Sequence, residues 1–198
     1  MTVVTIEMIK ELRQATGAGV LDCKKALEIA GGDLEKAISY LRRRGLAIAA
    51  KKAHRATKEG LIECYVHSDG RLAAMVELNC ETDFVARTEE FRRLAHELAM
   101  QVAATNPQYL SPEEIPPEVL AAKRDEYRAQ AMEEGKPEQV IERIVEGKLE
   151  KFYQDVCLLK QPFIKDDDLT VEQLIAQTIA KVGENIVLRR FVRYELGD

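Results

Sequence analysis

Cysteine and histidine are the residues of this sequence best suited to binding a metal or acting as nucleophiles. The four cysteines stand at Cys23, Cys64, Cys80 and Cys157. No two of them form a Cys-x-x-Cys pair, and zinc sites need ligands at such short spacings, so we expect no metal site. Lys24 and Lys25 directly follow Cys23, and neighbouring positive charge favours a reactive thiolate. No general base is implied nearby, which favours a small buried core residue instead.

The motifs of common catalytic and nucleotide-binding sites are missing from the sequence. It contains no Gly-x-x-x-x-Gly-Lys-Ser/Thr loop, no Gly-x-Gly-x-x-Gly, no Gly-x-Ser-x-Gly and no His-Glu-x-x-His. We therefore expect neither catalytic residues nor a bound cofactor. The sequence predicts a protein that acts by binding and is not an enzyme.

Val20 and Leu21 form the first of two clusters that suit a contact with a partner protein. They follow the turn Gly17-Ala18-Gly19 at the start of a predicted helix. Consecutive helical residues point about 100° apart, so both side chains cannot face the core of a thin helical bundle. At least one is expected to be exposed. Exposed apolar residues are common, however, and spacing alone favours no function for them.

The second cluster is Thr82-Asp83-Phe84-Val85, at a predicted junction between a strand and a helix. Asp83 suits the positive end of the helix dipole, and Thr82 or Thr88 is expected to cap the helix. Phe84 either fills the core or is presented to a partner. The spacing of these residues does not decide between the two interpretations.

Three short helices are predicted to hold the first cluster. Apolar residues recur at helical spacing over residues 6–16, 20–30 and 33–41. Glycines separate these segments, since glycine adopts backbone angles that other residues avoid. A basic, alanine-rich segment then runs from Arg42 to Lys58, and we expect it to form a linker helix. Residues 1–55 are thus predicted to be a three-helix domain with a basic linker.

Residues 56–198 mix strand and helix patterns. Strand-like runs at 61–67 and 72–78 flank Asp69-Gly70, which favours a tight primed turn, and residues 186–196 alternate as a third strand. Helical patterns occupy 91–103, 118–134, 137–153 and 171–182, whereas Gln161–Phe163 and Asp166–Asp168 are typical of irregular structure. The predicted fold class is α+β: an N-terminal three-helix bundle, then a core of about three antiparallel strands packed with helices.

Composition limits the classes of partner. With 34 acidic and 29 basic side chains the formal net charge is -5, which disfavours nucleic acid as the main partner. No apolar stretch approaches the roughly 20 residues that span a bilayer, and the first residues do not resemble a signal peptide. We therefore expect a cytoplasmic protein without a membrane partner.

Two long stretches resemble the elongation factor Ts family. Leu12-Arg13 followed by Thr16 to Leu27 is similar to the amino-terminal signature of that family, and Asn79 to Arg87 is similar to its second signature. Segments 158–163 and 190–197 are similar to the carboxy-terminal half of the family. The resemblance covers nearly the whole chain, and two long signatures in the right order are more specific than any short motif.

The resemblance implies both a fold and a function. It implies a ubiquitin-associated-like bundle before the core, and a nucleotide exchange factor that releases GDP from elongation factor Tu. In the family, residues matching Arg13, Val20 and Leu21 contact the nucleotide-binding domain of that partner. Those matching Asp83 and Phe84, within Thr82–Val85, enter near its magnesium site. The family often has methionines where Val20 and Leu21 stand, which keeps the contact apolar.

A different function remains open for the basic segment 42–58. It is consistent with an adaptor that binds the ribosome or RNA, with the bundle as a docking module. The acidic net charge and the lack of aromatic residues between the basic ones weigh against this alternative.

Length predicts a homodimer built through the core. Many members of the family carry two similar core modules, whereas this chain has room for one. An open three-stranded sheet leaves edges, which a second copy would cover by two-fold pairing. The candidate contacts are Val192, Tyr194 and the segment Val156–Phe163, in which Cys157 is expected to lie near its counterpart.

Overall fold

The structure is a computed structural model of the 198-residue chain, and it describes residues 4–197. The chain divides into two compact units. The first comprises the described residues up to Glu63, with Val76–Glu97 and Gln173–Arg189. The second comprises Cys64–Met75, Leu98–Glu172 and the described residues from Arg190 onward.

The predicted helices and strands occur in the expected order, and α4, β3 and β4 are additional to them. The α-helices are α1 (Ile6–Thr16), α2 (Val20–Ile29), α3 (Leu34–Lys52), α4 (Asp83–Ala86), α5 (Glu89–Thr105), α6 (Pro117–Glu133), α7 (Glu138–Val156) and α8 (Val171–Val182). The strands are β1 (Glu59–Val66), β2 (Leu72–Cys80), β3 (Pro162–Phe163), β4 (Asp166–Thr170) and β5 (Ile186–Glu195), and short 3-10 turns cover η1 (Pro112–Glu114) and η2 (Leu158–Lys160). The predicted α+β class is confirmed.

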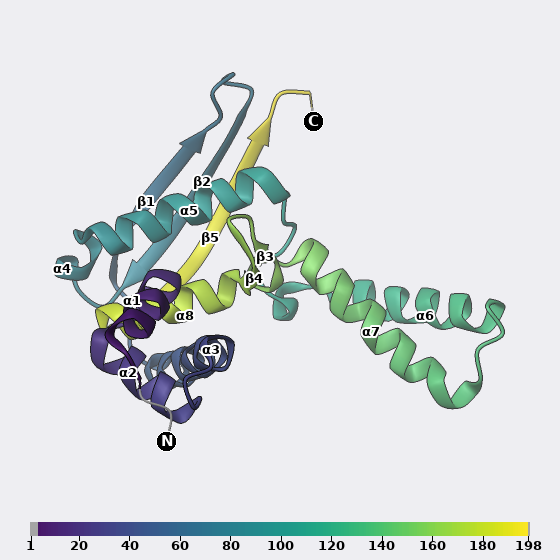
Figure 1. The fold of residues 1–198 in the computed structure, drawn as a ribbon. Coiled ribbons are helices and arrows are strands. Elements are labelled where there is room, and N and C mark those ends of the chain that lie inside the picture. The colour runs from purple at the N-terminus through teal and green to yellow at the C-terminus, as the bar shows by residue number, and fades with distance from the viewer. Residues whose placement is uncertain (1–3, 198) are drawn as a thin grey trace. The chain divides into compact units, whose positions relative to one another are not determined.

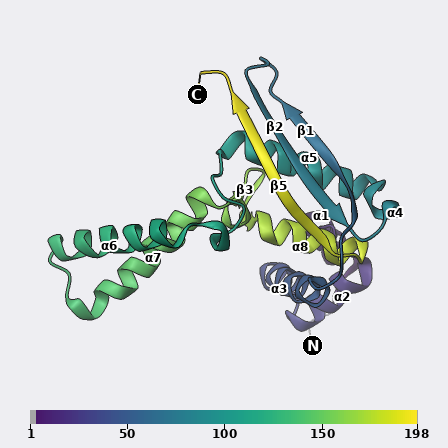
Figure 2. The ribbon, with the colours of Figure 1, turned by 180° about the vertical axis from the view of Figure 1, so that it is seen from behind.

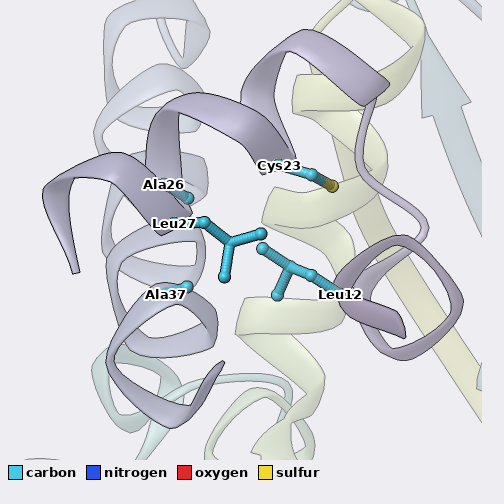
Figure 3. Packing of buried hydrophobic residues seen from close by; sticks show 5 residues of the cluster. All are labelled: Leu12, Cys23, Ala26, Leu27 and Ala37. Atoms are coloured by element: carbon cyan, nitrogen blue, oxygen red, sulfur yellow. The ribbon is translucent and has the colours of Figure 1, made fainter. Parts of the chain in front are cut away.

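Helices α1, α2 and α3 pack around a small core of their own. Figure 3 shows side chains from all three helices meeting there: Leu12, Cys23, Ala26, Leu27 and Ala37. Helix α1 ends where Gly17 adopts a left-handed conformation (φ 65°) and its N–H bonds the Arg13 carbonyl at 2.8 Å. The bundle is therefore as predicted, except that the third helix does not stop before the basic segment and runs unbroken to Lys52.

Strands β1, β2 and β5 form a three-stranded sheet in that order (Figure 1, and from behind in Figure 2). The predicted primed turn of the hairpin is wrong, because Asp69 lacks the positive φ that such a turn requires. A four-residue loop closes instead, with the Gly70 N–H bonded to the His67 carbonyl and the His67 N–H bonded to the Leu72 carbonyl, both at 2.8 Å.

Helix α5 covers one face of the sheet. In the first unit, Val76 and Leu78 of β2 are buried together with Phe91 and Leu94 of α5. In the second unit, the Arg193 guanidinium donates to the Ala103 carbonyl at 3.1 Å. The alternation predicted for β5 therefore changes along the strand: Ile186 and Leu188 are buried at its start, whereas Arg193, at an odd-numbered position, faces α5 near its end.

The segment predicted to be irregular is a small antiparallel ladder of β3 and β4 in the second unit. Phe163 pairs with Asp166, and Pro162 pairs with Thr170. The buried Gln101 amide explains this order, since its Nε2 donates to the Pro162 carbonyl at 3.1 Å and its Oε1 accepts the Ile164 N–H at 2.9 Å. A proline and three acidic residues disfavour regular structure locally, and the tertiary contact outweighs them.

Helices α6 and α7 form a hairpin in the second unit. Their shared apolar contacts are Ala131, Ile141, Val145 and Leu149, with Tyr127, Ile144 and Tyr153 at the margin. Cys157 directly after α7 and the adjacent Leu158 are fully buried, and Phe163 is largely buried. These buried side chains pack within one chain, so Cys157 does not lie at a surface where it could meet its counterpart, and the rest of segment 156–163 stays a prediction for the dimer contact.

Candidate partner-binding site

Phe84 stands on a one-turn helix directly after the second strand of the sheet. Its side chain is 81% exposed, while Ala86 two residues later is buried and anchors the same turn. Thr82 caps α4, and its Oγ1 accepts a long 3.5 Å bond from the Val85 N–H. Thr88 begins the next helix, α5, with its Oγ1 accepting the Phe91 N–H at 3.3 Å. Phe84 therefore does not fill the core, and an apolar ring is presented to solvent.

The base of α4 is held by contacts from a distant part of the first unit. Glu184 accepts both the Thr82 N–H at 3.0 Å and the Thr82 hydroxyl at 2.6 Å. Glu81 in turn accepts the Asn185 N–H at 2.6 Å. We call these four residues, Glu81, Thr82, Glu184 and Asn185, the junction clamp. They were not predicted, because residues about a hundred positions apart leave no local pattern.

Asp83 lies at the first position of α4 and is half-buried. Its Oδ2 accepts a bond from the Arg87 Nη2 at 2.8 Å, one helical turn later. An exposed pair of this kind adds little stability, because water screens both charges. The carboxylate therefore stays beside Phe84 with its negative charge partly balanced.

Glu81 gives the junction a dependence on pH. The Asn185 backbone N–H, followed by the Arg55 charge, holds the pKa of the Glu81 carboxyl below its usual value. A carboxyl with a lowered folded pKa stabilises the fold above its unfolded pKa of about 4.3, and that contribution is lost as pH falls through the folded pKa.

We expect Glu81→Gln to lower the free energy of unfolding at pH 7 and to have a much smaller effect at pH 3. Urea denaturation of both proteins at the two pH values measures the difference. Glu11→Gln, in the middle of α1, serves as the control and should leave the two curves parallel. If Glu81→Gln lowers the free energy of unfolding equally at both pH values, the role of the Glu81 carboxylate in the junction is wrong.

Val20 and Leu21 are both exposed on the first turn of α2, by 51% and 82%. Helical geometry required only one of these two side chains to be exposed. Cys23, Ala26 and Leu27 take the buried side of the helix, which leaves the first two residues outside it. Asp22, the next residue along the helix, pairs with Arg44 of α3. The bundle thus offers two neighbouring apolar side chains on a supported helix end.

Arg13 is exposed near this turn and lines a pocket of about 390 Å³ in the first unit. Arg44, Arg93 and Lys181 also line the pocket, as do the carboxylates of Asp22 and Glu90. Lys181 and Arg93 both pair with Glu90, at 2.6 and 2.9 Å. Among the residues of the two predicted clusters, the lining includes neither Val20 and Leu21 nor any residue of Thr82–Val85.

The reactive-thiolate interpretation of Cys23 is wrong. Its side chain is fully buried, and this burial raises the pKa of the thiol. Its Sγ lies 3.6 Å from the Ala18 carbonyl in the bundle core. Among residues 4–197, no three His, Cys, Asp or Glu side chains group to hold a metal ion.

Several cations of the basic segment are committed to contacts inside the first unit. Arg44 pairs with Asp22, Lys52 donates to the Gly183 carbonyl, and Arg55 pairs with Glu81 at 3.5 Å. These contacts leave fewer charges for phosphates than the sequence suggests, which weakens the case for an RNA-binding adaptor. Across the described residues, every helix is too short or too polar to cross a membrane.

Comparison with known proteins gives a consistent result. The family model described as elongation factor TS matches residues 35–198. The chain is similar to elongation factor Ts of Moorella thermoacetica, with 60% identity over 96% of this chain and 94% of that protein. It is similar to elongation factor Ts of Carboxydothermus hydrogenoformans, with 57% identity over 98% and 90%. For Thermoanaerobacter pseudethanolicus the values are 56% identity over 98% and 96%.

Proposed function

The chain belongs to the elongation factor Ts family, and we propose that it binds elongation factor Tu and promotes the release of GDP from it. The family acts in the elongation stage of protein synthesis. In this proposal the protein works by binding in the cytoplasm and has no catalytic residues of its own. No cofactor takes part.

The exposure of Phe84 is the observation that supports the proposal most. A phenylalanine that is 81% exposed at a supported helix start loses no core packing by entering a partner. Its ring is stiff, so ordering it on binding has a small entropic cost. Entering near a bound magnesium ion, the ring would displace the groups that hold the ion. Loss of a divalent cation weakens phosphate binding strongly. The charge of Asp83 beside the ring would add to this effect.

Val20, Leu21 and Arg13 have a different part in the proposal. They would hold the nucleotide-binding domain of elongation factor Tu while Phe84 acts. Two adjacent exposed apolar side chains on α2, together with the exposed Arg13 of α1, would supply the apolar and polar groups that are usual in a binding site between proteins.

Linkage gives the proposal a test. If the protein weakens the binding of GDP to elongation factor Tu, then GDP must weaken the binding of the protein to elongation factor Tu by the same factor. Titration calorimetry with purified elongation factor Tu should therefore give a tighter complex with the nucleotide-free form than with the GDP-bound form. Equal affinity for the two forms would contradict an exchange function, however tight the complex.

We further propose that the working form is a homodimer joined through the sheet face that α5 leaves uncovered (toward the viewer in Figure 2). In the second unit, strands β1, β2 and β5 and the residue that follows β5 carry exposed apolar side chains. These are Cys64, Val66, Met75, Val192, Tyr194 and Leu196. Apolar residues gathered on one surface mark a contact with another protein. A second copy is the simplest partner, because a two-fold contact brings a self-complementary surface against itself.

Tyr194→Asp is expected to convert the dimer to a monomer. The side chain is 72% exposed in one chain, so the fold should persist, while a carboxylate buried against its own copy repels it. Light scattering should give a mass near 22.3 kDa for the variant and twice that value for the parent protein. Met132→Asp, at an exposed position of α6, should leave the mass unchanged. A monomeric parent protein at micromolar concentration would rule out the dimer.

A further inference from the structure

We propose that residues Lys181–Asn185, from the end of α8 to the start of β5, act as positioning residues that fix the Phe84 helix relative to the α1–α2 turn. The proposal rests on the exchange function proposed above and extends it to residues that do not touch the partner. All of the groups involved lie within the first unit.

Glu184 fixes the direction in which α4 leaves the sheet. Its two carboxylate oxygens accept the backbone N–H and the hydroxyl of one residue, Thr82, at 3.0 and 2.6 Å. Two bonds to one residue define its orientation as well as its position. Because the Thr82 hydroxyl donates its proton to Glu184, its lone pairs are left to accept the Val85 N–H of α4. The carboxylate therefore sets the cap of the helix that carries Phe84.

Asn185 closes the junction clamp from the opposite side. Its backbone N–H donates to Glu81, the residue before Thr82, so each of the two chain segments supplies a carboxylate to the other. The Asn185 side chain is almost fully buried, and its Nδ2 donates to the Arg55 carbonyl at 3.0 Å. A buried amide without such a partner would be costly. The junction clamp thus also reaches the segment after α3.

Lys181 and Gly183 connect the same stretch to the helical bundle. A Cβ atom added to Gly17 would lie 4.0 Å from the Lys181 Nζ, so this ammonium sits against the turn that precedes Val20. The same Nζ bonds Glu90 of α5 at 2.6 Å. The Gly183 carbonyl accepts a bond from Lys52 at the end of α3. Four of the five residues in this stretch, Lys181, Gly183, Glu184 and Asn185, therefore contact the supports of the candidate contact points.

Helix α4 needs this external support. It has four residues, and a single turn is not stable by itself because nucleation of a helix is unfavourable. The exposed Phe84 ring makes no buried contact that could hold it in place. A ring that displaces groups of a partner must be held rigidly, so the position of α4 depends on the buried Ala86 and on the hydrogen bonds at its base.

Glu184→Ala tests the proposal. We expect the maximal rate of GDP release at saturating protein to fall roughly tenfold, while the concentration for half-maximal rate changes less than about threefold. The reason is that the variant loosens the Phe84 helix and leaves Val20 and Leu21 in place. Glu184→Gln keeps one acceptor oxygen and should give an intermediate rate. Hydrogen exchange of the Thr82 amide should accelerate in both variants.

Glu172→Ala is the matched control, since Glu172 lies at the other end of α8 and pairs with Lys160 at 3.0 Å, away from the junction clamp. Its maximal rate should match that of the parent protein. The proposal is overturned if Glu184→Ala keeps the parent maximal rate, or if Glu172→Ala lowers the rate equally. A parent protein that does not accelerate GDP release refutes the exchange function instead. In that case, unchanged Thr82 exchange in Glu184→Ala would refute the junction clamp separately.

Discussion

Phe84→Ala is expected to lower the maximal rate of stimulated GDP release by about a hundredfold, the size of a strong contact residue at a protein interface. The folded state should keep its stability, because the ring is exposed and its removal leaves no cavity. Stopped-flow release of fluorescent GDP from elongation factor Tu, over a range of protein concentrations, measures the maximal rate. Thermal unfolding of the same variant measures the stability of its folded state.

Ile29→Ala provides the comparison for this variant. Ile29 is another exposed large apolar residue of the first unit, at the end of α2, and belongs to neither cluster. It should release GDP at the parent rate. If Phe84→Ala unfolds the protein, or if both variants retain full activity, the assignment of Phe84 to the partner contact is wrong.

Leu21→Asp is expected to change the protein concentration that gives half-maximal GDP release, and not the maximal rate. The concentration for half-maximal GDP release should rise about a hundredfold, because a carboxylate would be buried without a partner in an apolar contact. The maximal rate should change little, since Phe84 is untouched. The variant should fold well, because a carboxylate in the first turn of α2 interacts favourably with the helix dipole.

Ile6→Asp is closely matched to it. Ile6 is the first residue of α1 and is exposed, so the substitution also places a carboxylate on the first turn of a bundle helix. It should bind like the parent protein. An equal loss of affinity in both variants would mean that added negative charge, and not the Leu21 contact, weakens the complex.

The bundle was predictable because its signals are local. Gly17 and the apolar spacing of α1 and α2 fix both the turn and the buried side, and the structure confirms them. The end of the third helix was not predictable. Gly45 of α3 is buried against α8, where an added Cβ would be in ordinary van der Waals contact with the Ala176 backbone at 3.7 Å. This packing keeps the basic segment helical beyond the point where its apolar pattern fades.

The candidate site was predictable in its members but not in its geometry. The two signatures name Thr82–Val85, Val20 and Leu21, yet spacing left Phe84 equally suited to the core. Only the three-dimensional structure separates Phe84, which is exposed, from Ala86, which is buried. Glu184 and Asn185 belong to neither signature. Their contacts with Thr82 and Glu81 depend on where β5 begins, and no local pattern encodes that position.

The rate of GDP release from elongation factor Tu measures the proposed exchange function itself. Elongation factor Tu is loaded with fluorescent GDP and mixed with excess unlabelled GDP, with and without the purified protein. We expect the release rate to rise with protein concentration and then to saturate, as binding before release requires. A release rate that stays at the spontaneous value, with folded protein at concentrations that calorimetry shows to be saturating, would contradict it.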